Sequence, residues 1–139
     1  MENLFVDTTF WVARFNTRDA NHDAALAFLE RLRSGQEGNF RLITTDYVFD
    51  ETVTAVLTRA KAHEAALEAG RAILASEAVR LEHVTPSEFT GAWDLFQKRG
   101  DKRWSFTDCA SFCLMDRLGL RKALAFDENF AQAGFATLP

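Results

Sequence analysis

The chain alternates short apolar segments with longer segments of helical periodicity, and this alternation restricts the folds it can adopt. Segments rich in apolar and β-branched residues, typical of short strands, occur at 3–6, 40–45, 79–85, 122–126 and 136–139. Strands that alternate with helices predict a parallel sheet, because each connection returns the chain to the same end of the sheet. We therefore expect an α/β fold, with a parallel sheet of about five strands flanked by helices on both faces.

Six helices are expected between or after these strands. Their apolar residues recur at spacings of three and four, and Gly35 and Gly119 stand where glycine commonly ends a helix. Pro86 stands at the first turn of one of them, where its missing N–H is no loss. The expected helices span residues 22–35, 46–62, 63–77, 86–100, 106–120 and, as a turn followed by a short helix, 127–135.

Composition predicts one globular domain over residues 1–139. No linker or repeat interrupts the chain, and 47% hydrophobic against 26% charged residues is an ordinary globular balance. No apolar run approaches the roughly 18 residues of a membrane span, and no secretory signal pattern opens the chain. We expect a cytoplasmic protein that does not contact a membrane.

Charge and cysteine spacing exclude some functions. The net charge of -4 argues weakly against a protein that binds long nucleic acids by overall electrostatic attraction. It does not exclude a local basic patch. Cys109 and Cys113 are four residues apart among apolar neighbours, which is helical spacing rather than a CxxC pair. Two buried, reduced thiols are expected.

Four acidic residues stand where a parallel α/β sheet forms a site. Asp7 and Asp127 each directly follow an expected strand. Asp108 lies at the start of an expected helix, and Glu51 lies about one and a half turns into another. Since the carboxyl ends of parallel strands meet at one edge of the sheet, all four side chains can converge there.

A divalent cation is the counter-charge that such a cluster needs, because ionised carboxylates repel one another. Mg²⁺ and Mn²⁺ prefer hard oxygen ligands, can activate water and can stabilise the charge on a phosphodiester during cleavage. Thr9, Ser105 and Thr107 supply hydroxyls that could support the carboxylates or bound water.

Helix capping is the alternative role of the same acids. Ser105 and Asp108 fit a capping box, Asp127 could cap a short helix, and Glu51 could be a solvated helix residue. Each acid alone favours this structural role, whereas the four together favour a metal site. Trp93 and Trp104 are expected in the core rather than as base-stacking side chains.

Four segments together resemble, in order and spacing, the motifs of PIN-domain ribonucleases, most closely the VapC group of toxin–antitoxin systems. They are LFVDTTFWVA, TTDYVFDETVT, SFTDCASFCLM and ALAFDENFAQAGF, and the resemblance covers essentially the whole chain. It implies a five-stranded parallel sheet and cleavage of RNA with Mg²⁺ or Mn²⁺. Matched motif by motif, it implies a catalytic and metal-binding set of Asp7, Glu51, Asp108 and Asp127, with Thr9 as the hydroxyl after the first acid.

The resemblance also implies supporting residues and partners. Thr107 and Asn129 join Ser105 as candidate supporting residues, whereas Asp50 points about 100° away from Glu51 on a helix and is left out. VapC-type proteins usually form homodimers and are inhibited by a small antitoxin, so an RNA substrate, an antitoxin and a homodimer are expected. The candidate phosphate contacts, each equally explained as solvated surface, are Arg59, Lys61, Arg99, Lys102 and Arg103.

Three alternatives remain open. The chain could be a stand-alone PIN nuclease without an antitoxin, or a non-catalytic α/β binding module whose acids are caps. The segment DTT also resembles the start of a haloacid-dehalogenase-type phosphatase, but that family needs a lysine at a strand end, and Lys122 begins a strand. A position of Glu51 or Asp108 on the side opposite to Asp7 would argue against the nuclease.

Overall fold

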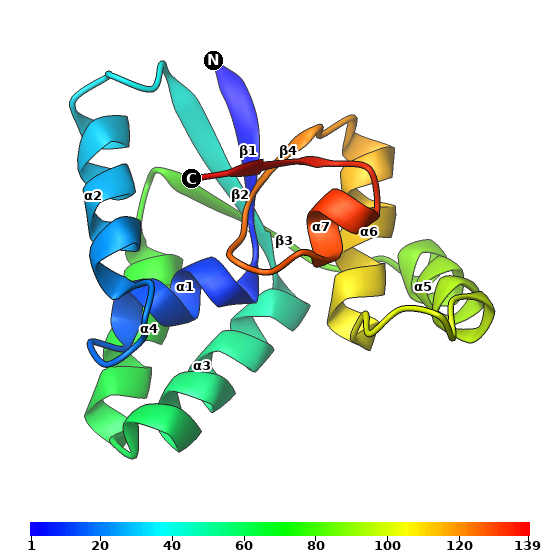
Figure 1. Cartoon of the computed structure of the whole chain (residues 1–139), viewed down its shortest axis with the longest axis horizontal. Helices are drawn as coiled ribbons and strands as arrows, with labels where there is room; N and C mark the ends of the chain where they lie inside the picture. The colour runs from blue at the N-terminus through cyan, green and yellow to red at the C-terminus, as the bar shows by residue number, and fades with distance from the viewer.

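The computed structural model describes all 139 residues, and its five strands form one parallel sheet with the order β3-β2-β1-β4-β5 (Figure 1). The central strand β1 is hydrogen-bonded to β2 on one side and to β4 on the other. The predicted α/β fold with a five-stranded parallel sheet is confirmed. The strands are β1 (Glu2–Val6), β2 (Phe40–Thr45), β3 (Val79–Glu82), β4 (Lys122–Leu124) and β5 (Ala136–Leu138).

Seven helices cover the two faces of the sheet. Helices α1 to α4 contact one another on one side, and α5 to α7 form a second group around α6 (Figure 1). Helix α3 also contacts α6, so the two groups meet at one end of the sheet. None of the helices has both the length and the apolar character needed to cross a membrane. The helices are α1 (Thr8–Phe15), α2 (His22–Arg33), α3 (Asp46–Ala60), α4 (His63–Ala75), α5 (Pro86–Lys98), α6 (Phe106–Leu118) and α7 (Asn129–Gln132).

The sequence predicts every element except α1. Helices α2 to α6 begin at the predicted residue and end two residues before the predicted end, and α7 is shorter than its predicted segment. Helix α1 is not predicted because it lacks a polar face: it is buried on most of its surface. Its buried residues are Thr8, Phe10, Trp11, Val12 and Ala13.

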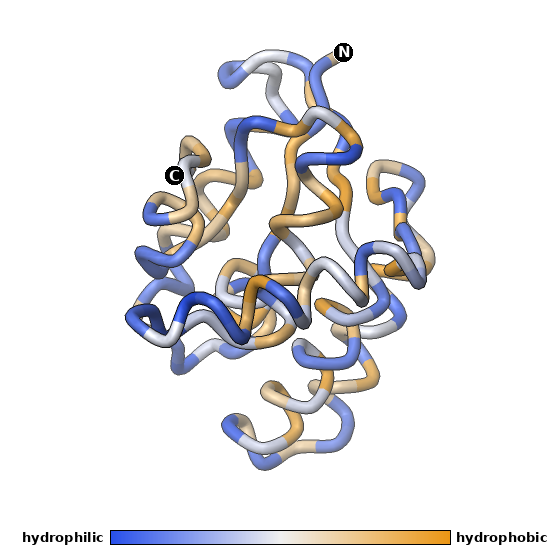
Figure 2. Tube along the Cα trace, turned by 90° about the vertical axis from the view of Figure 1, so that its right-hand side faces the viewer, coloured by the Kyte–Doolittle hydropathy of each residue, from blue (hydrophilic) through white to orange (hydrophobic).

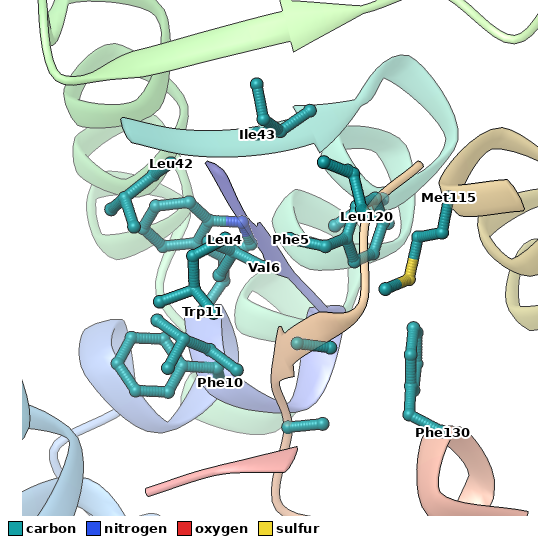
Figure 3. Packing of buried hydrophobic residues seen from close by; sticks show 14 of the residues in the cluster. Leu4, Phe5, Val6, Phe10, Trp11, Leu42, Ile43, Met115, Leu120 and Phe130 are labelled. Atoms are coloured by element: carbon teal, nitrogen blue, oxygen red, sulfur yellow. The ribbon is translucent and has the colours of Figure 1, made fainter. Parts of the chain in front are cut away.

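The core is built on both sides of β1. Leu4, Phe5 and Val6 are fully buried, which explains why this strand is a continuous apolar run rather than an alternating one. Figure 3 shows Phe10 and Trp11 on one side of β1, with Met115 and Phe130 on the other. Figure 2 shows hydrophobic residues along the central strands and hydrophilic residues in many of the outer turns.

Two expectations about buried side chains need correction. Trp104 lies in the core as predicted, 6% exposed, but Trp93 is 50% exposed on α5. Helix α5 makes its main contacts with α6 alone, so its outer face has no neighbour. Both cysteines are free thiols as expected, but only Cys109 is buried, and Cys113 is partly exposed.

Candidate active site

Asp7 occupies the junction between the end of β1 and the start of α1. Its backbone N–H donates to the carbonyl of Leu124 in β4 (3.0 Å), so the sheet itself fixes its position. Its carboxylate accepts hydrogen bonds from the Thr9 amide (3.2 Å) and the Thr9 hydroxyl (2.6 Å) and caps α1. The residue is only 1% exposed, so the strand delivers a carboxylate into the interior.

Thr9 connects this carboxylate to the segment that follows β4. Its hydroxyl donates to Asp7 and accepts a hydrogen bond from the Phe126 amide (3.0 Å). Asp127 is the next residue along, and its carboxylate accepts from the Asn129 amide (3.1 Å). One threonine hydroxyl therefore ties together the chain segments that carry the first and the fourth acid.

Asp108 lies in the first turn of α6 and is 5% exposed. Its carboxylate accepts from the Ser105 amide (2.9 Å), while the Ser105 hydroxyl accepts from the Asp108 amide (3.0 Å), so the expected capping box is present. The same carboxylate accepts from the side-chain amide of Asn129 (2.9 Å). Asp108 can therefore cap α6 and belong to the site at the same time, because the cap orients its carboxylate.

Glu51 completes the group from α3. This helix starts directly after β2, where the Thr45 hydroxyl caps it by accepting from the Val48 amide (3.0 Å). Glu51 is partly buried and close enough to Asp108 for its charge to raise the pKa of that carboxyl group. All four predicted acids thus lie at the edge formed by the carboxyl ends of the strands.

The pKa values of these acids are raised first by burial and, for Asp7 and Asp108, further by the neighbouring acids. Burial raises the pKa of Asp7 to about 8, the charges of Asp108 and Asp127 add to the rise, and the Thr9 hydrogen bonds oppose it. Burial likewise raises the pKa of Asp108 to about 6, with further increases from Asp127 and Glu51. Burial also raises the pKa of Asp127. The site is thus a set of carboxylates without a compensating positive charge.

The donor set fits a hard, hydrated cation better than a closed metal site. No group of three or more acidic, histidine or cysteine side chains lies close enough together to hold a metal ion by direct contacts alone. Mg²⁺ commonly binds through one or two carboxylates and keeps several waters, so it does not require such a cluster. Carboxylate oxygens around a buried, uncompensated Asp7 meet that requirement.

The supporting hydroxyls differ in what they contact. The Ser105 hydroxyl is used in the helix cap, and it is the Ser105 backbone amide that reaches a carboxylate. Thr107 lies in a polar groove of about 380 Å³ beside the acids. The groove is lined by Asp50, Glu51, Thr54, Ala55, Thr58, Arg59 and Thr107.

Two of these lining residues, Thr54 and Thr58, are not among those predicted from the sequence. Their spacing could have indicated them: Asp50, Thr54 and Thr58 follow one another at intervals of four along α3, which places all three on one face of the helix. Asp50, which helical geometry had left out, also lines this groove.

The candidate phosphate contacts fall into separate groups. Arg59 lies on the wall of the polar groove. Arg99 is already committed within the protein, because it pairs with Asp101 (3.0 Å) and lies over the ring of Trp104 (4.9 Å). The other three candidates, which form no ion pair in the structure, are Lys61, Lys102 and Arg103.

Comparison with known proteins agrees with this geometry. The PIN domain family matches residues 4–136. The 23S rRNA-specific endonuclease VapC20 of Mycobacterium tuberculosis is 39% identical over 132 residues, which are 95% of each chain, in strains CDC 1551 / Oshkosh and H37Rv alike. The crystal structure of M. tuberculosis VapC20, described as a Sarcin-Ricin loop cleaving toxin, aligns with a TM-score of 0.83, at 37% identity over 96% of each chain. The chain therefore belongs to the PIN domain family, and the VapC-like resemblance of its four motifs is confirmed.

Proposed function

We propose that residues 1–139 form one nuclease domain that hydrolyses RNA phosphodiester bonds with Mg²⁺ or Mn²⁺. PIN nucleases as a family use divalent metal ions. The observation that most supports the proposal is the burial of Asp7 beside Asp108 and Asp127, which raises the pKa of Asp7 to about 8. Such an arrangement is unfavourable for the fold by itself, and a bound cation removes the penalty.

The four acids have distinct positions in this proposal. Asp7, Glu51 and Asp108 would hold the principal ion, and Asp127 would complete that site or help a second ion to bind. The ion, when bound, supplies activation of a water and stabilisation of the charge that develops on the phosphodiester.

The neighbouring polar residues orient these carboxylates. Thr9 holds the carboxylate of Asp7 through its hydroxyl and its amide, and Asn129 holds that of Asp108 through its side-chain amide. Because the pKa of Asp7 lies near 8, this residue carries a proton at neutral pH, and that proton leaves when a cation binds.

The relatives direct the choice of substrate and partners. Since VapC20 is named as an enzyme specific for 23S rRNA and described as cleaving the Sarcin-Ricin loop, we take a structured ribosomal RNA loop as the substrate class of this protein. A small antitoxin that covers the acids, a homodimer and a cytoplasmic location complete the proposed toxin role. A small open reading frame immediately upstream of the gene would favour this role over a stand-alone nuclease.

Cleavage of an RNA loop by the purified protein tests the proposal. We expect products with Mn²⁺ or Mg²⁺ and none with EDTA, and a loss of at least about 10²-fold for Asp7→Asn and for Asp108→Asn. Asp116→Asn is the matched control, because Asp116 is exposed in a later turn of α6. Equal activity in all three variants would point to a contaminant or another site. Metal binding without cleavage by the wild type would favour the non-catalytic module.

A further inference from the structure

Asn129, the first residue of α7, is the one residue that hydrogen-bonds two of the four acids. Its side-chain amide donates to Oδ2 of Asp108 (2.9 Å), and its backbone amide donates to Oδ1 of Asp127 (3.1 Å). The other residues that donate to the acids each contact a single one. Asn129 therefore connects the start of α6 to the segment that follows β4.

Aromatic packing fixes the position of Asn129. The next residue, Phe130, is fully buried, and its ring stacks on that of Phe5 in β1 with centroids 5.7 Å apart. The same ring packs edge-on against Phe112 of α6, with centroids 4.9 Å apart. Strand β1 leads to the first acid and α6 carries the third, so Phe130 anchors Asn129 to both of the elements that position these acids.

The hydrogen bonds leave one oxygen of each carboxylate free. Both bonds from Thr9 end on Oδ2 of Asp7. Both bonds to Asp108 end on its Oδ2, and the bond to Asp127 ends on its Oδ1. The second oxygen of each acid accepts no hydrogen bond from the protein, and none of the three is sealed from solvent. Each of these acids thus keeps one oxygen that a cation entering from solvent can reach.

The donors that hold the acids are all neutral. No lysine, arginine or histidine forms an ion pair with any of the four. A cationic side chain would orient a carboxylate and also compensate its charge, which would weaken its attraction for a metal ion. The amides of Asn129 orient two acids and leave their charge available.

We propose that Asn129 is a positioning residue of the metal site, which holds Asp108 and Asp127 in the orientation that leaves one oxygen of each for the cation. This inference rests on the proposed nuclease function and adds a residue that acts through the acids rather than on the RNA. Without the side-chain amide, Asp108 keeps only the hydrogen bond from the Ser105 amide and is held less firmly against repulsion by Asp127. A less firmly held carboxylate loses more freedom when it binds a cation, so the affinity falls.

Mn²⁺ binding by the Asn129→Ala protein is the direct test. Asn129 is partly exposed and alanine favours a helix, so the variant should fold. The substitution removes the hydrogen bond to Asp108 and keeps the backbone hydrogen bond to Asp127. Electron paramagnetic resonance of the free ion measures the affinity, and we expect Mn²⁺ to bind about 10- to 100-fold more weakly than to the wild type.

Gln132→Ala is the matched control, because Gln132 carries a side-chain amide on the same short helix and contacts none of the acids. Its carbonyl oxygen accepts a hydrogen bond from the Trp104 indole N–H (3.2 Å). Both variants lose one hydrogen bond, so both should lower the urea midpoint. Only Asn129→Ala should change the affinity for Mn²⁺.

Cleavage at increasing Mn²⁺ concentration separates positioning from a purely structural role. The Asn129→Ala protein should need about 10- to 100-fold more Mn²⁺ for half-maximal cleavage. Saturating Mn²⁺ should bring its kcat close to the wild-type value, because the residue touches neither the RNA nor the reacting atoms.

Three results would overturn the inference. They are an unchanged affinity for Mn²⁺ in Asn129→Ala, an equal loss of affinity in Gln132→Ala, and a loss of cleavage that saturating Mn²⁺ does not restore. A wild type that neither binds Mn²⁺ nor cleaves RNA would refute the proposed function and this inference with it, and that result is recognised because it needs no variant.

Discussion

The acid-carrying edge of the sheet and the outer face of α5 are built in opposite ways. Asp7 and Asp108 are almost fully buried, and hydrogen bonds from Thr9, Ser105 and Asn129 hold their carboxylates. The rings of Phe89, Trp93 and Phe96 on α5 are about half exposed. Trp93 stacks on Phe96, and Phe89 and Phe96 contact Phe106 of α6. The acid-carrying edge holds buried acids without a positive charge beside them, and the outer face of α5 exposes apolar side chains to solvent. Both depart from what stability alone would favour, which is typical of functional surfaces.

The largest expected effect is a loss of cleavage when one acid at the edge of the sheet is neutralised. Asp108→Asn keeps an oxygen that can accept from the Ser105 amide, so the cap and the fold should survive. Cleavage should fall about 10²- to 10³-fold. The helical content measured by circular dichroism should stay unchanged, because the cap is kept. A parallel loss of helical content would show that the variant disturbs the fold and not only the site.

The next effect tests the unbalanced charge through stability. The folded pKa of Asp7, about 8, exceeds its ordinary value of 3.8, so the folded protein retains a proton that the unfolded chain loses between these values. The metal-free fold therefore loses stability as the pH rises from about 4 to about 8. Asp7→Asn should avoid this loss and be more stable than the wild type by at least about 2 kcal/mol at pH 8.

Urea unfolding in EDTA measures this difference, and the advantage of Asp7→Asn should shrink steadily towards pH 4. Saturating Mn²⁺ should also reduce it, because the cation stabilises only the wild-type site. An advantage that is independent of pH would contradict the assigned cause.

A smaller effect concerns how α5 is held. Glu88→Gln removes the charge from a buried ion pair whose partner Arg117 is partly exposed, which should lower the free energy of unfolding by about 2 kcal/mol. Glu30→Gln is the matched control, because the exposed pair of Glu30 with Arg33 should contribute less than about 0.5 kcal/mol. Similar urea midpoints for the two variants would show that the ion pair does not anchor α5.

Thr9→Val tests the hydrogen bonds that join Asp7 to the segment after β4. Loss of the hydroxyl leaves the Phe126 amide without its acceptor and should cost about 1–2 kcal/mol, whereas Thr9→Ser should be nearly neutral. Since Thr9 lowers the pKa of Asp7, its removal should also shift the pH dependence of Mn²⁺ binding upward. Calorimetric titration at several pH values detects the shift, and an unchanged profile would contradict it.

The smallest effect concerns the single cations that are candidate phosphate contacts. Arg103→Ala should reduce the slope of log affinity for single-stranded RNA against log salt concentration by about 0.7, the value for one phosphate contact. Arg41→Ala, an exposed arginine on β2 without an ion pair, should leave the slope unchanged. A reduction of equal size in both variants would indicate non-specific attraction rather than a defined contact.

Local patterns predicted most of the fold because they depend on neighbouring residues. The strand at 40–45 was predicted at both ends, and the capping box of Ser105 and Asp108 was readable from four residues. Helix α1 was missed because a helix buried on most sides has no polar stripe to show its period. Trp93 was misplaced because a helix pattern does not tell which apolar residues find a neighbour.

The sequence by itself determined the order of the strands and of every helix except α1, and it placed each acid after a strand or in the first turns of a helix, since these features depend on local periodicity and capping. Only the tertiary structure decided that Asp7 is buried beside Asp108 and Asp127, and that one hydroxyl of Thr9 joins two strand ends. It alone also left the aromatic face of α5 exposed. The physical reason is that burial and electrostatic coupling depend on contacts between segments far apart in the chain, which no local pattern records.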